Sequence, residues 1–190
     1  MRKAGAELFE VLEEGHPVSD LLAASPAAFT RWEHYPSEAV ADARTGSSWF
    51  YHAHEPSEAR RWEEHGHFHC FSSIDDAPVH LAAISIESSG VPTRLFATNR
   101  WVTNESLHPA GKVVPLVERF AIRADRRFAL TSRWLSAMLR LFQPQVAWLL
   151  QERDRVLAKR GKKYAENTSV EILAVAQIDL DRHLAALEQC

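Results

Sequence analysis

Five histidines lie within eighteen residues of this chain, in two segments whose spacing is typical of β-strands. His52 and His54 belong to the first segment, and His65, His67 and His69 belong to the second. Alternate side chains of an extended strand point to the same face, about 6.6 Å apart. If the two segments pair as a hairpin, up to five imidazoles gather on one side of a sheet. Such a cluster of nitrogen donors has the chemistry of a transition-metal site.

We therefore predict a metal site built from His52, His54, His67 and His69. A shell of four histidines, or of three histidines and a carboxylate, suits a divalent zinc, iron, copper or nickel ion. A ligating imidazole usually has a partner for its second ring nitrogen. Four glutamates flank the strands and are candidates for that role or for an oxygen ligand: Glu55, Glu58, Glu63 and Glu64.

Two other interpretations of the histidines stay open. In the first, they are partly buried, hydrogen-bonded residues of a polar and aromatic sheet face, or part of a surface that binds a protein partner. In the second, the face binds an organic ligand without a metal ion, with haem as a variant because histidine can ligate its iron axially. The predicted metal site could also belong to a metal-dependent enzyme. In that case an open coordination position would hold water or a small-molecule substrate.

A second group of polar residues, Asn99, Arg100 and Trp101, lies at the end of a predicted strand. A strand here would direct Asn99 and Trp101 to one face and Arg100 to the other. Arginine is suited to bidentate binding of a carboxylate or phosphate, so we predict a ligand-binding role for the group. The alternative is a strand edge at which Arg100 pairs with one of the many acidic residues of this half of the chain.

The pattern of the remaining chain predicts an α+β fold. Sequential strands with short connections favour an antiparallel sheet of about four strands, with helices packed on its apolar face. The expected strands cover residues 48–54, 66–73, 78–87 and 92–102, and the expected helices cover 3–14, 19–24, 125–142 and 144–159. Residues 25–47 are predicted to wrap the sheet irregularly, and 115–123 and 169–178 are compatible with helix or strand. We expect one domain over residues 1–190.

Charge and cysteine content narrow the class of protein. Residues 112–163, the basic segment, hold 13 basic and four acidic side chains. We expect these charges to lie on exposed helix faces and to complement the acidic half of the domain, without nucleic-acid binding. Only Cys70 and Cys190 are present, which favours a reducing, cytoplasmic location over a disulfide framework. No apolar run approaches a membrane span, and the sequence does not indicate an oligomeric state.

The motifs YHAH, which ends at His54, EHGHFHCF, which ends at Phe71, and TNRWVT, which ends at Thr103, resemble an uncharacterised bacterial family classed as a domain of unknown function. The resemblance covers most of the chain, and the histidine motif is its most specific part. It implies a bacterial, single-domain protein. Because no activity is established for that family, the resemblance carries no catalytic roles.

Overall fold

The computed structural model describes residues 2–15, 18, 21, 33–53, 64–87 and 89–188 of the chain. A six-stranded antiparallel sheet lies at its centre, and each strand pairs with the next along the chain. The strands are β1 (His34–Asp42), β2 (Ser47–Ala53), β3 (Gly66–Ile74), β4 (Ala77–Ile86), β5 (Pro92–Thr98) and β6 (Ile172–Gln177). The predicted antiparallel α+β fold is confirmed, with two more strands than the four expected.

The two additional strands lie at the edges of the sheet. β1 occupies part of the segment that we expected to be irregular, so that expectation was wrong for residues 34–42. β6 settles the open choice at 169–178 in favour of a strand, which pairs with β5 although Ala176 follows its partner Leu95 by 81 positions in the chain. The sequence left the choice open because Ala174 and Ala176 also suit a helix, and a partner strand so distant in the chain cannot be identified from local residues.

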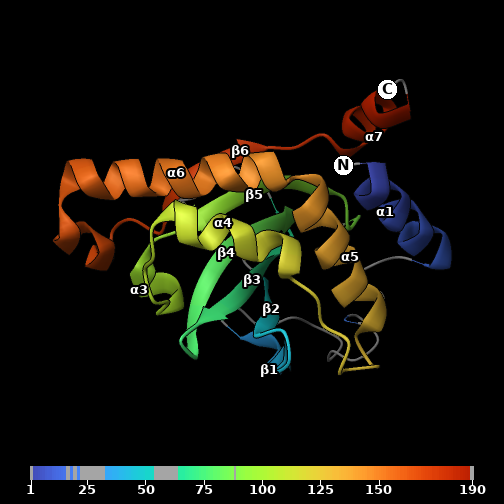
Figure 1. Ribbon diagram of the computed structural model, residues 1–190, viewed down its shortest axis with the longest axis horizontal. Coiled ribbons are helices and arrows are strands. Elements are labelled where there is room, and N and C mark those ends of the chain that lie inside the picture. The colour runs from blue at the N-terminus through green and yellow to red at the C-terminus, as the bar shows by residue number, and fades with distance from the viewer. Residues whose placement is uncertain are drawn as a thin grey trace.

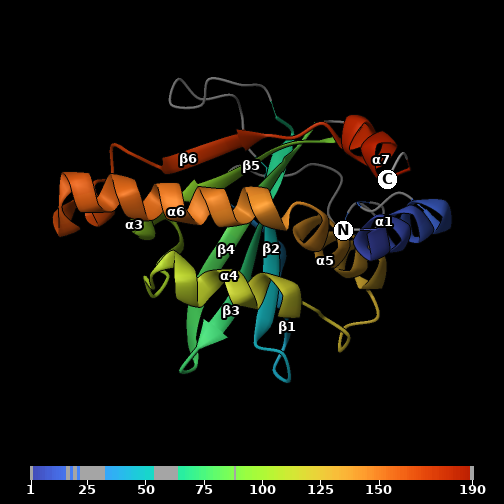
Figure 2. The ribbon, with the colours of Figure 1, turned by 45° about the horizontal axis from the view of Figure 1, so that its top comes forward.

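Helices cover one face of the sheet (Figures 1 and 2). Their bounds are α1 (Arg2–Glu14), α3 (Arg100–Thr103), α4 (Ala110–Arg119), α5 (Ala129–Leu141), α6 (Gln143–Arg160), the 3₁₀ helix η1 (Lys162–Glu166) and α7 (Leu180–Glu188). The core between the layers is rich in aromatic rings. Trp134 of α5 packs against Phe68 of β3 at 5.7 Å between ring centroids. Trp49 of β2 donates its indole N–H to Ser132 Oγ at 2.9 Å, so the buried ring also keeps a polar partner.

Three helix predictions need correction or completion. The segment 115–123, left open, is mostly helical, because α4 runs to Arg119. The helix expected from 125 begins only at Ala129, and Asp125 instead accepts the backbone N–H of Arg127 at 2.8 Å in the preceding turn. The helix expected over 19–24 falls largely outside the described residues. Among the residues that the structure describes, no helix is long and apolar enough to cross a membrane.

Most basic side chains of the basic segment are exposed, as expected. Arg133 and Arg140 of α5 reach the acidic face of α1, where they pair with Glu14 at 2.5 Å and Glu7 at 2.7 Å. The prediction of exposed charges is wrong for Arg153, whose side chain is 1% exposed. Its guanidinium donates to the carbonyl of His108 at 2.6 Å and contacts Asp154 at 2.7 Å, so internal acceptors replace the solvent.

A β-bulge in β4 decides which residues share a face with the histidines. Cys70 of β3 pairs with Ala82, whereas the next residue, Phe71, pairs with His80, so Leu81 is an additional residue in β4. An extra residue reverses the alternation of side chains beyond it. His80 therefore lies on the same face as Ala83. Simple alternation would place the two residues on opposite faces.

Candidate metal centre

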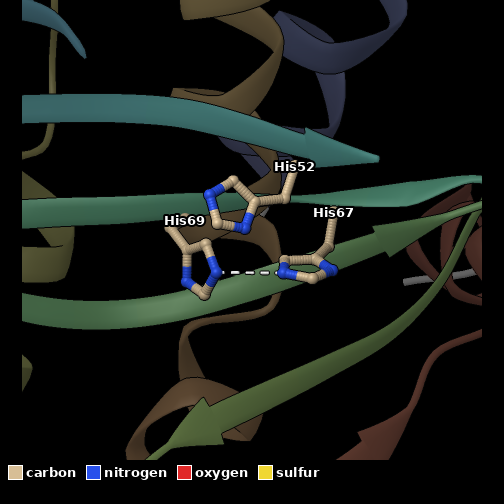
Figure 3. A group of neighbouring side chains, drawn as sticks. All are labelled: His52, His67 and His69. Carbon is tan, nitrogen blue, oxygen red and sulfur yellow. Dashed lines mark hydrogen bonds between the residues drawn. The ribbon is translucent and has the colours of Figure 1, made fainter. Parts of the chain in front are cut away.

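Three histidines converge on the sheet face opposite the helices. His52 of β2 and His67 and His69 of β3 each offer one ring nitrogen within 4.8 Å of the other two (Figure 3). His52 is paired directly with His67 across the two strands, as the predicted hairpin requires. His67 and His69 are each 1% exposed, whereas His52 is partly exposed. The group thus has a buried side and a side that solvent reaches.

The geometry of His67 and His69 suits a shared ion. Their Nε2 atoms lie 2.9 Å apart. Two nitrogens that each bind one ion at about 2.1 Å are separated by about 3.0 Å at a right angle and by about 3.4 Å at the tetrahedral angle. The observed spacing is close to the first value, so little movement of the two rings would bring both nitrogens into bonding distance. The same pair makes a hydrogen bond when one nitrogen carries a proton.

A buried carboxylate orients His67. Glu64, whose side chain is 3% exposed, lies 3.1 Å from His67 Nδ1 through Oε1. The hydroxyl of Ser85, on the neighbouring strand β4, donates to the other carboxylate oxygen. This is the arrangement in which a carboxylate fixes the ring of a metal ligand and leaves its Nε2 for the ion. The prediction that a flanking glutamate could contact the cluster is confirmed for Glu64.

The sequence reasoning missed a fourth histidine, His80. Its Nε2 lies 3.1 Å from His69 Nδ1, and its Nδ1 lies 3.4 Å from the hydroxyl of Thr98. Burial, with smaller contributions from Arg153 and His67, lowers the pKa of His80 to about 3, so its ring is neutral at physiological pH. The bulge in β4 hid His80 from an alternation argument. Its only sequence signal is that it is the one histidine in a strand otherwise made of apolar and small residues.

Aromatic rings form the walls around the histidines. Phe50 contacts His69 at 5.0 Å, Phe96 contacts His67 at 5.0 Å and Phe71 contacts His80 at 5.1 Å, all between ring centroids. Burial between such rings favours neutral imidazole, which is the form that binds a metal ion.

His34 borders the open side of the cluster. This exposed residue of β1 stacks on Phe50 at 4.1 Å and lies beside His52, with 4.4 Å between their ring centroids. His34 and Phe50 thus both border the partly exposed ring of His52, with Phe50 5.1 Å from it between ring centroids.

The remaining two of the five histidines are His54 and His65. His54 lies outside the described residues, so its predicted role as a ligand stays a prediction. His65 precedes β3, and its Nδ1 lies 2.5 Å from the hydroxyl of Tyr51. Tyr51 is buried in the core on the helix side of the sheet, so the expectation that His65 shares the face of His67 and His69 was wrong.

The group Asn99, Arg100 and Trp101 is placed by a short helix, so its expected strand was wrong from residue 99 onward. Asn99 caps α3, and its amide donates to the carbonyls of Tyr164 and Val170 at 2.9 and 3.1 Å. Trp101 Nε1 donates to the carbonyl of Val170 at 2.8 Å, and Arg100 pairs with Glu166. These contacts hold η1 and the segment after it against α3. A ligand-binding role for the group stays a prediction.

The fold and the cluster together define an α+β protein with a three-histidine group on its sheet, supported by a buried carboxylate. The chain belongs to the family described as a domain of unknown function, DUF6969, whose profile matches residues 4–178. The resemblance to an uncharacterised family is thereby confirmed. No curated protein and no solved structure matches the chain.

Proposed function

We propose that this protein binds a divalent transition-metal ion through His52, His67 and His69. The observation that carries the proposal is the gathering of three ring nitrogens within 4.8 Å of one another, with two of the rings almost fully buried. Imidazole ligands suit zinc, iron, copper or nickel and are a poor match for magnesium or calcium, which prefer oxygen ligands. Glu64 supports this assignment, since its contact with His67 Nδ1 leaves His67 Nε2 directed into the group.

Three protein nitrogens leave part of the coordination shell for another ligand. His52 is the partly exposed member, so we propose that water or a small molecule binds the ion from that side. An ion with such an open position supplies Lewis-acid activation of the bound molecule. His54 is a candidate fourth ligand in this proposal, because it follows His52 with the spacing of an alternate residue.

We also propose a cytoplasmic location and no role in nucleic-acid binding. The free, buried thiol of Cys70 supports the first, since a reduced cysteine suits that compartment. The pairing of Arg133 and Arg140 with acidic residues of α1 supports the second, because it neutralises part of the basic segment within the domain.

Metal titration tests the function. Purified protein, stripped with chelator and titrated with Zn²⁺ or Co²⁺ in a calorimeter, should bind one ion per chain, and the Co²⁺ absorption spectrum should report nitrogen ligation. His69→Ala should lower the affinity by at least 100-fold, because it removes one of three ligands. His65→Ala is the matched control, as it removes a histidine two residues from His67 that lies outside the group, and it should bind like the wild type.

The same preparation separates the competing interpretations. Wild-type protein that binds neither ion above background, or a His69→Ala variant with unchanged affinity, would contradict the proposal. A Soret band in protein supplied with haem, lost in His69→Ala, would assign the cluster to haem binding instead.

A further inference from the structure

A continuous chain of polar contacts runs from Glu64 across three strands to Thr98. Glu64 contacts His67 Nδ1, His67 Nε2 contacts His69 Nε2, His69 Nδ1 contacts His80 Nε2, and His80 Nδ1 contacts Thr98 Oγ1. The last three of these contacts measure 2.9 Å from His67 to His69, 3.1 Å from His69 to His80 and 3.4 Å from His80 to Thr98. Both ring nitrogens of each of the three histidines, His67, His69 and His80, therefore take part in this series of contacts.

With no ion bound and all three rings neutral, the contact with Glu64 determines where each proton lies. A carboxylate only accepts, so His67 Nδ1 carries the proton and the Nε2 of the neutral ring does not. The contact between the two Nε2 atoms then needs the proton of His69, which leaves His69 Nδ1 as an acceptor. By the same reasoning His80 donates from Nε2, and the hydroxyl of Thr98 donates to His80 Nδ1.

A bound ion requires the opposite proton positions on His69 and His80. The nitrogens that face each other in the cluster are the Nε2 atoms of His67 and His69, and a ligating nitrogen carries no proton. His67 already meets this condition. His69 does not, because in the ion-free chain its proton lies on Nε2.

From these contacts we propose that binding of the metal ion reverses the tautomers of His69 and His80, and that His80 is the positioning residue which makes His69 a ligand. The inference rests on the proposed metal-binding function. In the loaded state His69 Nδ1–H donates to His80 Nε2, and His80 Nδ1–H donates to Thr98 Oγ1. Each ring keeps one proton, which moves from Nε2 to Nδ1 by exchange with water, so the two rings neither release nor take up a net proton.

Nitrogen NMR of histidine-labelled wild-type protein tests the reversal. Long-range proton–nitrogen spectra, recorded at pH 8.5 to keep the rings neutral, distinguish the protonated nitrogen of each imidazole. We expect His69 and His80 to carry their protons on Nε2 in chelated protein and on Nδ1 after saturation with Zn²⁺. His67 is an internal control and should keep its proton on Nδ1 in both states.

A matched pair of variants tests the positioning role. His80→Gln keeps an acceptor oxygen near the place of Nε2, whereas His80→Leu leaves the Nδ1–H of His69 without that acceptor. We expect His80→Leu to weaken Zn²⁺ binding by about 10–100-fold, the usual range for a lost partner of a ligand, and His80→Gln to recover most of the loss. Chelated spectra of both variants check that the cluster remains folded.

The outcomes distinguish this inference from the function on which it rests. If Zn²⁺ leaves the resonances of His67 and His69 unchanged, the proposed metal site is wrong, and the reversal with it. If Zn²⁺ saturates the cluster while His80 keeps its proton on Nε2, or if His69 already carries its proton on Nδ1 in chelated protein, only the reversal is overturned. Equal affinities of wild type and His80→Leu would remove the positioning role.

Discussion

Replacing His67 with alanine should separate a metal ligand from a structural histidine. The side chain is 1% exposed and contacts Glu64 at 3.1 Å and His69 at 2.9 Å. Loss of these buried contacts costs about 1–3 kcal/mol of unfolding free energy, and that cost applies whether or not metal is present. A structural role therefore predicts equal destabilisation in both conditions.

A ligand role adds a second effect that depends on metal. With free Zn²⁺ at about 100 times the dissociation constant, binding stabilises the folded wild type by about 2.7 kcal/mol, or about 5–11 °C in melting temperature for a chain of this length. If His67→Ala lowers the affinity by about 100-fold, the same Zn²⁺ concentration stabilises the variant by only about 0.4 kcal/mol. The metal-dependent increase in melting temperature should then nearly vanish.

Thermal melts in Zn²⁺ buffer and in chelator measure both effects on one set of samples. His183→Ala is the control, because His183 packs on Phe142 at 4.6 Å between ring centroids, away from the cluster, and should keep the full increase. An increase of equal size in His67→Ala and wild type, or none in wild type, would refute the assignment of His67 as a ligand.

Four further outcomes are expected. Because burial lowers the pKa of His80 from 6.5 to about 3, its contribution to stability is full above pH 6.5 and is lost as the pH falls toward 3. Urea unfolding in chelator should show a loss of about 2 kcal/mol at pH 5 that His80→Gln does not share. Burial raises the pKa of Glu105 from 4.5 to about 7, so this carboxyl destabilises the folded state increasingly as the pH rises from 4.5 to 7. In the same assay, the unfolding free energy of Glu105→Gln should therefore rise relative to wild type over this range, by up to about 3 kcal/mol. Gly66→Ala should unfold at markedly lower urea concentration, since an added Cβ would overlap the carbonyl oxygen of His52; an unchanged midpoint would show that the strands can separate there. A gel shift at physiological salt should show no nucleic-acid binding by the basic segment, and strong, salt-sensitive binding would disprove this.

The sequence by itself determined the local features of the sheet and part of the site. Alternation places His67 and His69 on one face of a strand wherever that strand lies, because successive side chains point in opposite directions. The turn signals around Gly90 likewise fix β4 and β5 as neighbours. Pro144 in the first turn and Gly161 after the last residue bound α6, since each suits the backbone at its own end of a helix.

Tertiary structure decided what depends on partners distant in the chain. β6 is extended because β5 pairs with it, and Asn99 leaves the strand to cap α3 because the backbone near Val170 accepts its amide protons. His80 joins the cluster only through the bulge at Leu81, which reverses the alternation and cannot be placed from a single strand. The spacing of the histidines is thus a local property of the chain, whereas their hydrogen-bonded partners follow from the register between strands.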